Sequence, residues 1–171
     1  EISGDGRWVA YTLRRTNVTD DEEDPVLHLR DLGSDREIEI PGAHGGEFSR
    51  DSRWLVYEVD EVEKDSTREA TPQRFELREL ASGRLRSWEG IAAAEFNTTS
   101  SHVLLRRKSD EDDDDARGAD HLLHDLADGR TLHLGALGDA AFSRQGDLLA
   151  YAVQADDREG NGLLVLDVAA D

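Results

Sequence analysis

The sequence predicts an all-β fold, a partial β-propeller of about three and a half four-stranded blades, from two repeated patterns. The first is a strand–turn–strand phrase that begins at Ile2, Phe48, Phe96 and Phe142, so that successive copies start 46, 48 and 46 residues apart. A period in this range, carried by short strands, is typical of propeller blades. We therefore expect one β-propeller fragment over residues 1–171, with blades at approximately 1–41, 42–89, 90–135 and 136–171.

The second pattern is an acidic residue followed by an aliphatic one, once per unit, where the third strand should end. Its copies are Asp31-Leu32, Glu79-Leu80, Asp125-Leu126 and Asp167-Val168. It supports the same register independently of the first phrase. No segment has the pattern of an amphipathic helix of three turns.

The first unit shows the expected order of strands. Asp5-Gly6 is a hairpin turn signal, and the following Trp8–Leu13 is apolar on both faces, as expected of an inner strand covered by neighbouring blades. Val26–Leu32 is the third strand, and Arg36–Ile40 is polar enough for an outer edge.

The other units repeat this order. In the third, Thr98-Thr99-Ser100-Ser101 replaces the Asp-Gly turn, so its hairpin has the weakest turn chemistry. The remaining strands are expected at Arg53–Val59, Arg74–Leu80, Arg84–Trp88, Ile91–Phe96, Asp120–Leu126, Arg130–Leu134, Gly138–Phe142, Leu148–Val153 and Leu163–Val168.

The chain is strongly acidic, with 39 Asp and Glu against 20 Lys and Arg and a net charge of −19. This charge repels nucleic acids and anionic membrane surfaces, so we expect neither as a partner. Only two of the bases are lysines, a balance that suggests a source rich in salt. No run approaches the roughly 18 apolar residues of a membrane helix.

The chain has no cysteine, which excludes disulfides and thiolate metal sites. It begins inside the repeat phrase and contains no Met, so we expect it to be a piece of a longer precursor.

Four acidic connectors, at 14–25, 60–73, 107–119 and 156–162, follow the second strand of each unit and should emerge on one face. They could dock a basic partner or divalent ions, but such charge runs are more often simply solvated. The run Asp110–Asp115 does not fit an EF-hand, because Asp115 stands where glycine is needed and His121 where a bidentate Glu is needed. We predict no metal site and no cofactor.

The six histidines form no ligand motif. His121 and His124 are three apart, which in a strand places them on opposite faces. His102 replaces Trp8 and Trp54 of the repeat, which favours a structural role. His44, beside Gly45 and Gly46, is expected on a loop entering an innermost strand, and is the histidine to test by mutation. The remaining two are His28 and His133.

Catalytic signatures are missing from the sequence. It has no G-x-S-x-G nucleophile motif, no G-x-x-x-x-G-K-[ST] and no G-x-G-x-x-G. The repeated aromatic residues, Trp8, Trp54, Tyr11, Tyr57 and Tyr151, are interpreted as packing between blades. We therefore predict no catalytic, cofactor-binding or metal-binding residue in this chain.

The phrases FSRDSRWLVYEV, from Phe48, and FSRQGDLLAYAV, from Phe142, resemble the F-S-x-D-G-x-x-L-A-Y repeat of TolB-like propellers and of the propeller domain of the prolyl oligopeptidase family. The stretch from Gly118 to Val168 is similar to the N-terminal propeller of large bacterial peptidases of that family, whereas the G-H and W-D pairs of WD repeats are missing.

This resemblance implies a non-catalytic region that caps a C-terminal α/β-hydrolase domain of the same precursor and selects peptide substrates for it. It also implies a periplasmic or secreted location. The alternative is a TolB-like propeller that binds a protein or peptide ligand and has no enzymatic domain. A third possibility is a stand-alone adhesive or scaffold repeat.

Overall fold

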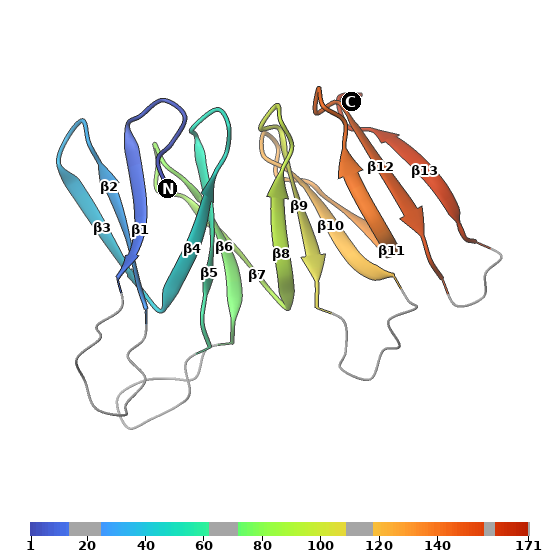
Figure 1. Cartoon of the computed structure of the whole chain (residues 1–171), viewed down its shortest axis with the longest axis horizontal. Coiled ribbons are helices and arrows are strands. Elements are labelled where there is room, and N and C mark those ends of the chain that lie inside the picture. The colour runs from blue at the N-terminus through green and yellow to red at the C-terminus, as the bar shows by residue number, and fades with distance from the viewer. Residues whose placement is uncertain (14–24, 62–71, 109–117, 156–159, 171) are drawn as a thin grey trace. The chain divides into compact units, whose positions relative to one another are not determined.

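The computed structural model describes residues 1–13, 25–61, 72–108, 118–155 and 160–170. Within these ranges the chain forms thirteen strands, no helix, and three antiparallel sheets (Figure 1). The expected all-β class is therefore confirmed. The chain divides into two compact units, residues 1–90 and 91–171, each of which is described by itself.

The first unit contains two sheets. The first sheet has the order β1 (Trp8–Leu13), β2 (Val26–Asp31), β3 (Arg36–Pro41), and Ile2 adds a bridge to Val9. The second has the order β4 (Ala43–Phe48), β5 (Trp54–Val59), β6 (Arg74–Glu79), β7 (Leu85–Glu89). The second sheet has the four strands expected of a blade. β5 is almost wholly buried, as its apolar sequence predicts.

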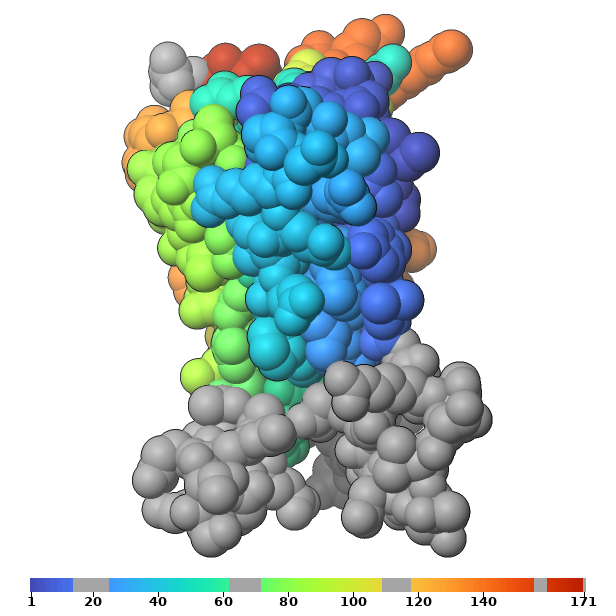
Figure 2. All heavy atoms as spheres, turned by 90° about the vertical axis from the view of Figure 1, so that its left-hand side faces the viewer, coloured from blue at the N-terminus to red at the C-terminus, as the bar shows by residue number. Residues whose placement is uncertain are grey.

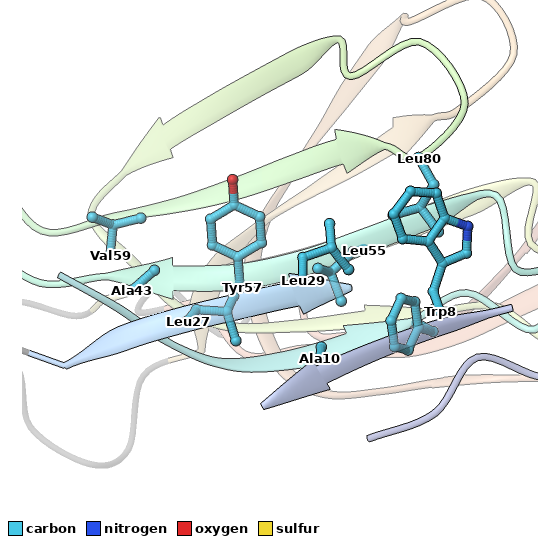
Figure 3. Close-up of a cluster of buried hydrophobic side chains, with 10 residues drawn as sticks. Trp8, Ala10, Leu27, Leu29, Ala43, Leu55, Tyr57, Val59 and Leu80 are labelled. Atoms are coloured by element: carbon cyan, nitrogen blue, oxygen red, sulfur yellow. The ribbon is translucent and has the colours of Figure 1, made fainter. Parts of the chain in front are cut away.

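The two sheets of this unit pack face to face (Figure 3). Alternation along each strand places one set of side chains on the shared interface. The buried cluster comprises Trp8, Ala10, Leu27 and Leu29 from the first sheet and Ala43, Phe48, Leu55, Tyr57, Val59 and Leu80 from the second. Burying each of the larger side chains contributes about 1.5–3 kcal/mol, so this interface stabilises the unit substantially.

The second unit is one six-stranded sheet. Its order is β8 (Ile91–Phe96), β9 (His102–Arg107), β10 (Ala119–Asp125), β11 (Thr131–Phe142), β12 (Leu148–Val153), β13 (Gly162–Asp167). Its core cluster is Leu104, Leu123, Leu134, Leu137 and Leu149.

β11 differs from the sequence expectation of two strands, Arg130–Leu134 and Gly138–Phe142. Its first part pairs with β10 and its last part with β12, with a register shift between Leu137 and Ala140. The corresponding junctions in the first unit are broken by Gly42 (φ 73°) and Gly90 (φ 65°). Here Ala136 takes the same left-handed conformation (φ 53°), and the strand continues on either side of it.

All four copies of the repeated turn have the same backbone hydrogen bonds. The first residue of the turn donates its N–H to the carbonyl five residues on, and the fourth donates its N–H back to the first; the copies start at Ser3, Ser49, Asn97 and Ser143. The third hairpin, for which the sequence has the weakest turn chemistry, therefore forms like the others. Asn97 Oδ1 accepts from the N–H of His102 at 2.9 Å, and this bond corresponds to the one that Ser49 Oγ accepts from the N–H of Trp54 at 3.0 Å in the second repeat.

Candidate functional site

A cluster of His44, Glu58 and Asp60 is the clearest group of chemically capable side chains among the described residues. His44 Nε2 lies 3.0 Å from Asp60 Oδ1. One possible ligand atom from each of the three lies within 4.8 Å of the others. All three side chains are half-buried, so an ion or water molecule could reach them.

The local fold of β4 and β5 brings this cluster together. His44 is paired directly across from Glu58, and Asp60 follows two residues later, just after the end of β5, where its N–H donates to the carbonyl of Gly42. The expectation that His44 lies on a loop was wrong, because β4 begins at Ala43. Gly45 (φ 69°) and Gly46 (φ 117°) permit a register shift before Glu47, so the strand continues through the glycines.

Gln73 extends the cluster by donating a hydrogen bond from its side-chain amide to Glu58 Oε1. This bond fixes one oxygen of the carboxylate. The arrangement thus offers one imidazole nitrogen and two carboxylates, donors suited to a divalent metal ion. Sequence reasoning singled out His44 but missed Glu58 and Asp60, since they become neighbours only through the pairing of β4 with β5.

A second polar group lies on the face of the first sheet that points away from the second sheet; Figure 2 views the unit from that side. Tyr11 stacks on His28, with ring centroids 5.0 Å apart. The Tyr11 hydroxyl donates to Glu37 Oε1 at 2.7 Å, and His28 Nδ1 lies 2.9 Å from the same oxygen. These contacts raise the pKa of Tyr11 and lower that of Glu37. The group is a closed hydrogen-bonded set without an evident substrate position.

The histidines of the second unit are separate from one another. His121 contacts the carbonyl of Ala119 and His124 contacts Thr131, as expected of side chains on opposite faces. Burial lowers the pKa values of His121 and of His102, whose Nδ1 lies 2.9 Å from Ser101 Oγ. His133 is exposed. In the described part of the chain, these histidines join no group of three possible metal ligands.

Two clefts are formed within the second unit. One, of about 440 Å³, lies between β8, β9 and β11 and is lined by Glu95, Arg106, His121 and Asp139 among others. The other, of about 330 Å³, is bordered by His102, Asp125, Arg130 and the end of β13. Both clefts are open and partly charged, and Thr131, which lines the second, has its Oγ1 2.8 Å from Nδ1 of the buried His124.

Most of each acidic connector, and the whole of Asp110–Asp115, lies outside the described residues. Their shared face and their ability to bind ions therefore stay predictions. Among the described residues, no helix could cross a membrane.

No protein-family model and no curated protein matches the sequence. Solved structures do match. Prolyl oligopeptidase B from Galerina marginata, solved with a 25mer macrocyclization substrate, aligns with a TM-score of 0.62 and 12% identity over 100% of this chain and 27% of its own. The β-propeller domain of the Trilobed protease from Pyrococcus furiosus aligns with a TM-score of 0.58 and 12% identity, over 94% of this chain and 50% of its own. A eukaryotic initiation factor aligns with a TM-score of 0.59 and 12% identity, over 99% of this chain and 40% of its own.

These likenesses establish the fold class. The chain is a partial β-propeller, with the fold of the propeller domains of prolyl oligopeptidase-family peptidases, as the repeat phrase predicted. It spans about half or less of each of these proteins. The initiation factor shows that the same fold also occurs outside peptidases.

Proposed function

We propose that this chain is the propeller region of a prolyl oligopeptidase-like serine peptidase and restricts the access of peptides to a catalytic domain of the same protein. The observation that carries the proposal is the fold similarity over the whole chain to prolyl oligopeptidase B, a protein solved with a 25mer macrocyclization substrate. Because this chain corresponds to about a quarter of that protein, the catalytic residues would lie elsewhere in the full-length polypeptide.

A domain that restricts the access of peptides must be rigid, and hydrogen bonds between successive repeats stiffen each unit. In the first, the N–H of Asp5 donates to Ser52 Oγ at 3.0 Å, so that the bond joins two successive copies of the turn. In the second, Asn97 Nδ2 donates to the carbonyl of Gly146 at 2.8 Å, and Thr98 Oγ1 to that of Arg144 at 3.1 Å. These bonds join the same turn of neighbouring repeats.

The first test is enzymatic. The purified 171-residue chain should show no hydrolysis of proline-containing peptide amides or esters, because no nucleophile motif is present. The full-length protein should hydrolyse them. A full-length protein that lacks this activity but captures a protein or peptide ligand would instead support the alternative, a TolB-like binding propeller.

The second test addresses substrate selection in the full-length enzyme. Asn97→Ala removes the bond to Gly146 between two repeats, together with the bonds that Oδ1 accepts within its own turn. The propeller should become less rigid, so the cleavage of long peptides should rise several-fold relative to short ones. Ser82→Ala is the control, since this hydroxyl bonds Glu79 and the N–H of Arg84 within its own turn. Equal changes for long and short peptides would contradict the selecting role.

The proposal also includes a periplasmic or secreted location, which cell fractionation can test.

A further inference from the structure

His44, Glu58 and Asp60 occupy positions where the repeat does not require them. Their counterparts, 48 residues on, are Ala92, Arg106 and Lys108, and a further 46 residues on they are Gly138, Ala152 and Gln154. The strands β8–β9 and β11–β12 pair in the same antiparallel way with these different residues. The hairpin therefore forms without the cluster, and the three side chains need another explanation than folding.

The donor atoms of the cluster suit a divalent cation. Two carboxylate groups and one imidazole ring each offer a ligand atom within 4.8 Å of the others. A bound divalent ion would neutralise both carboxylates and use the imidazole nitrogen as a third ligand.

We propose that His44, Glu58 and Asp60 form a binding site for a divalent transition-metal ion of the Zn²⁺ type. Three protein ligands with the fourth position left to water is a common arrangement for Zn²⁺. The nitrogen donor selects against Ca²⁺ and Mg²⁺, which prefer six or more oxygen ligands or a nearly ideal octahedron. In a tetrahedral site with bonds of about 2.1 Å the two atoms would lie about 3.4 Å apart. The hydrogen-bonded separation of 3.0 Å between His44 Nε2 and Asp60 Oδ1 is therefore close to the required one and would widen slightly when the ion binds.

Gln73 has a defined part in this site. Its amide holds Glu58 Oε1, which leaves the other carboxylate oxygen for the metal and orients the group. Such outer contacts typically change metal affinity by roughly 10- to 100-fold when removed. Gln73 is thus a positioning residue and not a ligand. This site is independent of the peptidase proposal, since it lies wholly within β4, β5 and the residues that flank β5 and β6.

The test is a Zn²⁺ titration of the metal-free protein against a chromophoric chelator, with 150 mM NaCl and millimolar Ca²⁺ present to occupy the many exposed carboxylates. We expect one Zn²⁺ site per chain. His44→Ala and Asp60→Asn should each weaken it more than Gln73→Ala, which should weaken it by about tenfold. His133→Ala, at an exposed histidine, is the matched control and should bind Zn²⁺ as the unaltered protein does.

Co²⁺ provides a second readout, because a four-coordinate Co²⁺ ion absorbs visible light much more strongly than a hydrated one. The unaltered protein should show this absorption, and the isosteric Asp60→Asn and Glu58→Gln variants, with unchanged circular dichroism, should lose it. The proposal is overturned if Zn²⁺ binds the unaltered protein no more tightly than it binds His44→Ala. It is also overturned if His133→Ala weakens binding equally. Either result would leave the cluster as an ordinary ion pair.

Discussion

Asp31, the acidic residue at the end of β2, joins two segments of the first sheet. Its carboxylate accepts from Arg7 Nε at 3.1 Å and Nη2 at 3.0 Å, and also from the N–H of Gly33 and from Ser34 Oγ. The Arg7 guanidinium and these donors hold its pKa well below the ordinary range. The acid therefore ties the turn after its strand to the residue that precedes β1.

This pKa predicts how stability depends on pH. A carboxyl group whose pKa is depressed on folding contributes stability above its unfolded pKa of about 3.9, and the contribution is lost as the pH falls toward the folded value. Asp31→Asn should therefore lower the urea midpoint at pH 7 and flatten its decline below about pH 4.

Asp35→Asn is the control for this effect, since Asp35 is an exposed residue in the same turn and Asn tolerates its left-handed conformation (φ 54°). Urea midpoints measured between pH 2.5 and 7 test the prediction. Parallel pH curves for Asp31→Asn and the unaltered protein would contradict it.

For single residues, the sequence predicts which positions recur in each repeat better than it predicts which side chains contact each other. The acid–aliphatic pairs are visible in the sequence. In every repeat the N–H of the aliphatic residue donates to a carbonyl next to the repeated turn; the donors are Leu32, Leu80, Leu126 and Val168. The cluster around His44 could not be predicted, because it depends on a register shift at Gly45-Gly46 that only the pairing with β5 reveals.

The repeated turn is the element that fixes each hairpin. Its fourth residue has a positive φ in every copy: Gly6, Ser52, Ser100 and Gly146. At Gly146 a side chain would also collide with Thr98 Oγ1, at 2.6 Å from the Cβ position. In the first and fourth hairpins this residue is a glycine, Gly6 or Gly146, which is a turn signal in the sequence. In the second and third hairpins Ser52 and Ser100 adopt the same conformation, so these hairpins form without glycine.

The junction at Ala136 predicts a stabilising substitution. A non-glycine residue in the left-handed region costs roughly 1–2 kcal/mol, partly offset by the lower backbone entropy cost of alanine. Ala136→Gly should therefore raise the free energy of unfolding by about 0.5–1 kcal/mol, as measured by urea denaturation.

Ala140→Gly is the matched control, because Ala140 lies in the paired part of β11 and glycine should destabilise it by roughly 0.5–1 kcal/mol. If both substitutions destabilise, the conformation of Ala136 is not the strain that we infer. The sequence did not reveal that β11 is continuous. Ala136 stands where Gly42 and Gly90 stand in the earlier repeats, and an alanine gives no sign of a left-handed junction.

On the scale of the molecule, equivalent positions differ in burial. Leu27 and Leu29 are fully buried between the two sheets of the first unit. Their counterparts in β13, Leu163 and Val165, are 73% and 61% exposed. The repeat and its strand order were predictable from the sequence, but the exposure of one apolar face was predictable only as a consequence of the incomplete propeller.

This contrast predicts unequal effects of one substitution. Leu27→Ala should lower the free energy of unfolding by about 2–5 kcal/mol, because it leaves a cavity in the core. Leu163→Ala should change it by less than about 0.5 kcal/mol. Denaturation at two protein concentrations measures both. A large, concentration-dependent loss for Leu163→Ala would mean that copies of the chain cover this face in solution.

The hydrogen bond from each aliphatic residue after the third strand returns to the turn of its own repeat. Each module thus satisfies these backbone groups internally, whatever stands before or after it. Gain or loss of a whole repeat by gene duplication or deletion would therefore leave none of these backbone groups unpaired. Such changes would alter the chain in steps of about 46 residues, whereas shorter insertions would have to fall in the connectors.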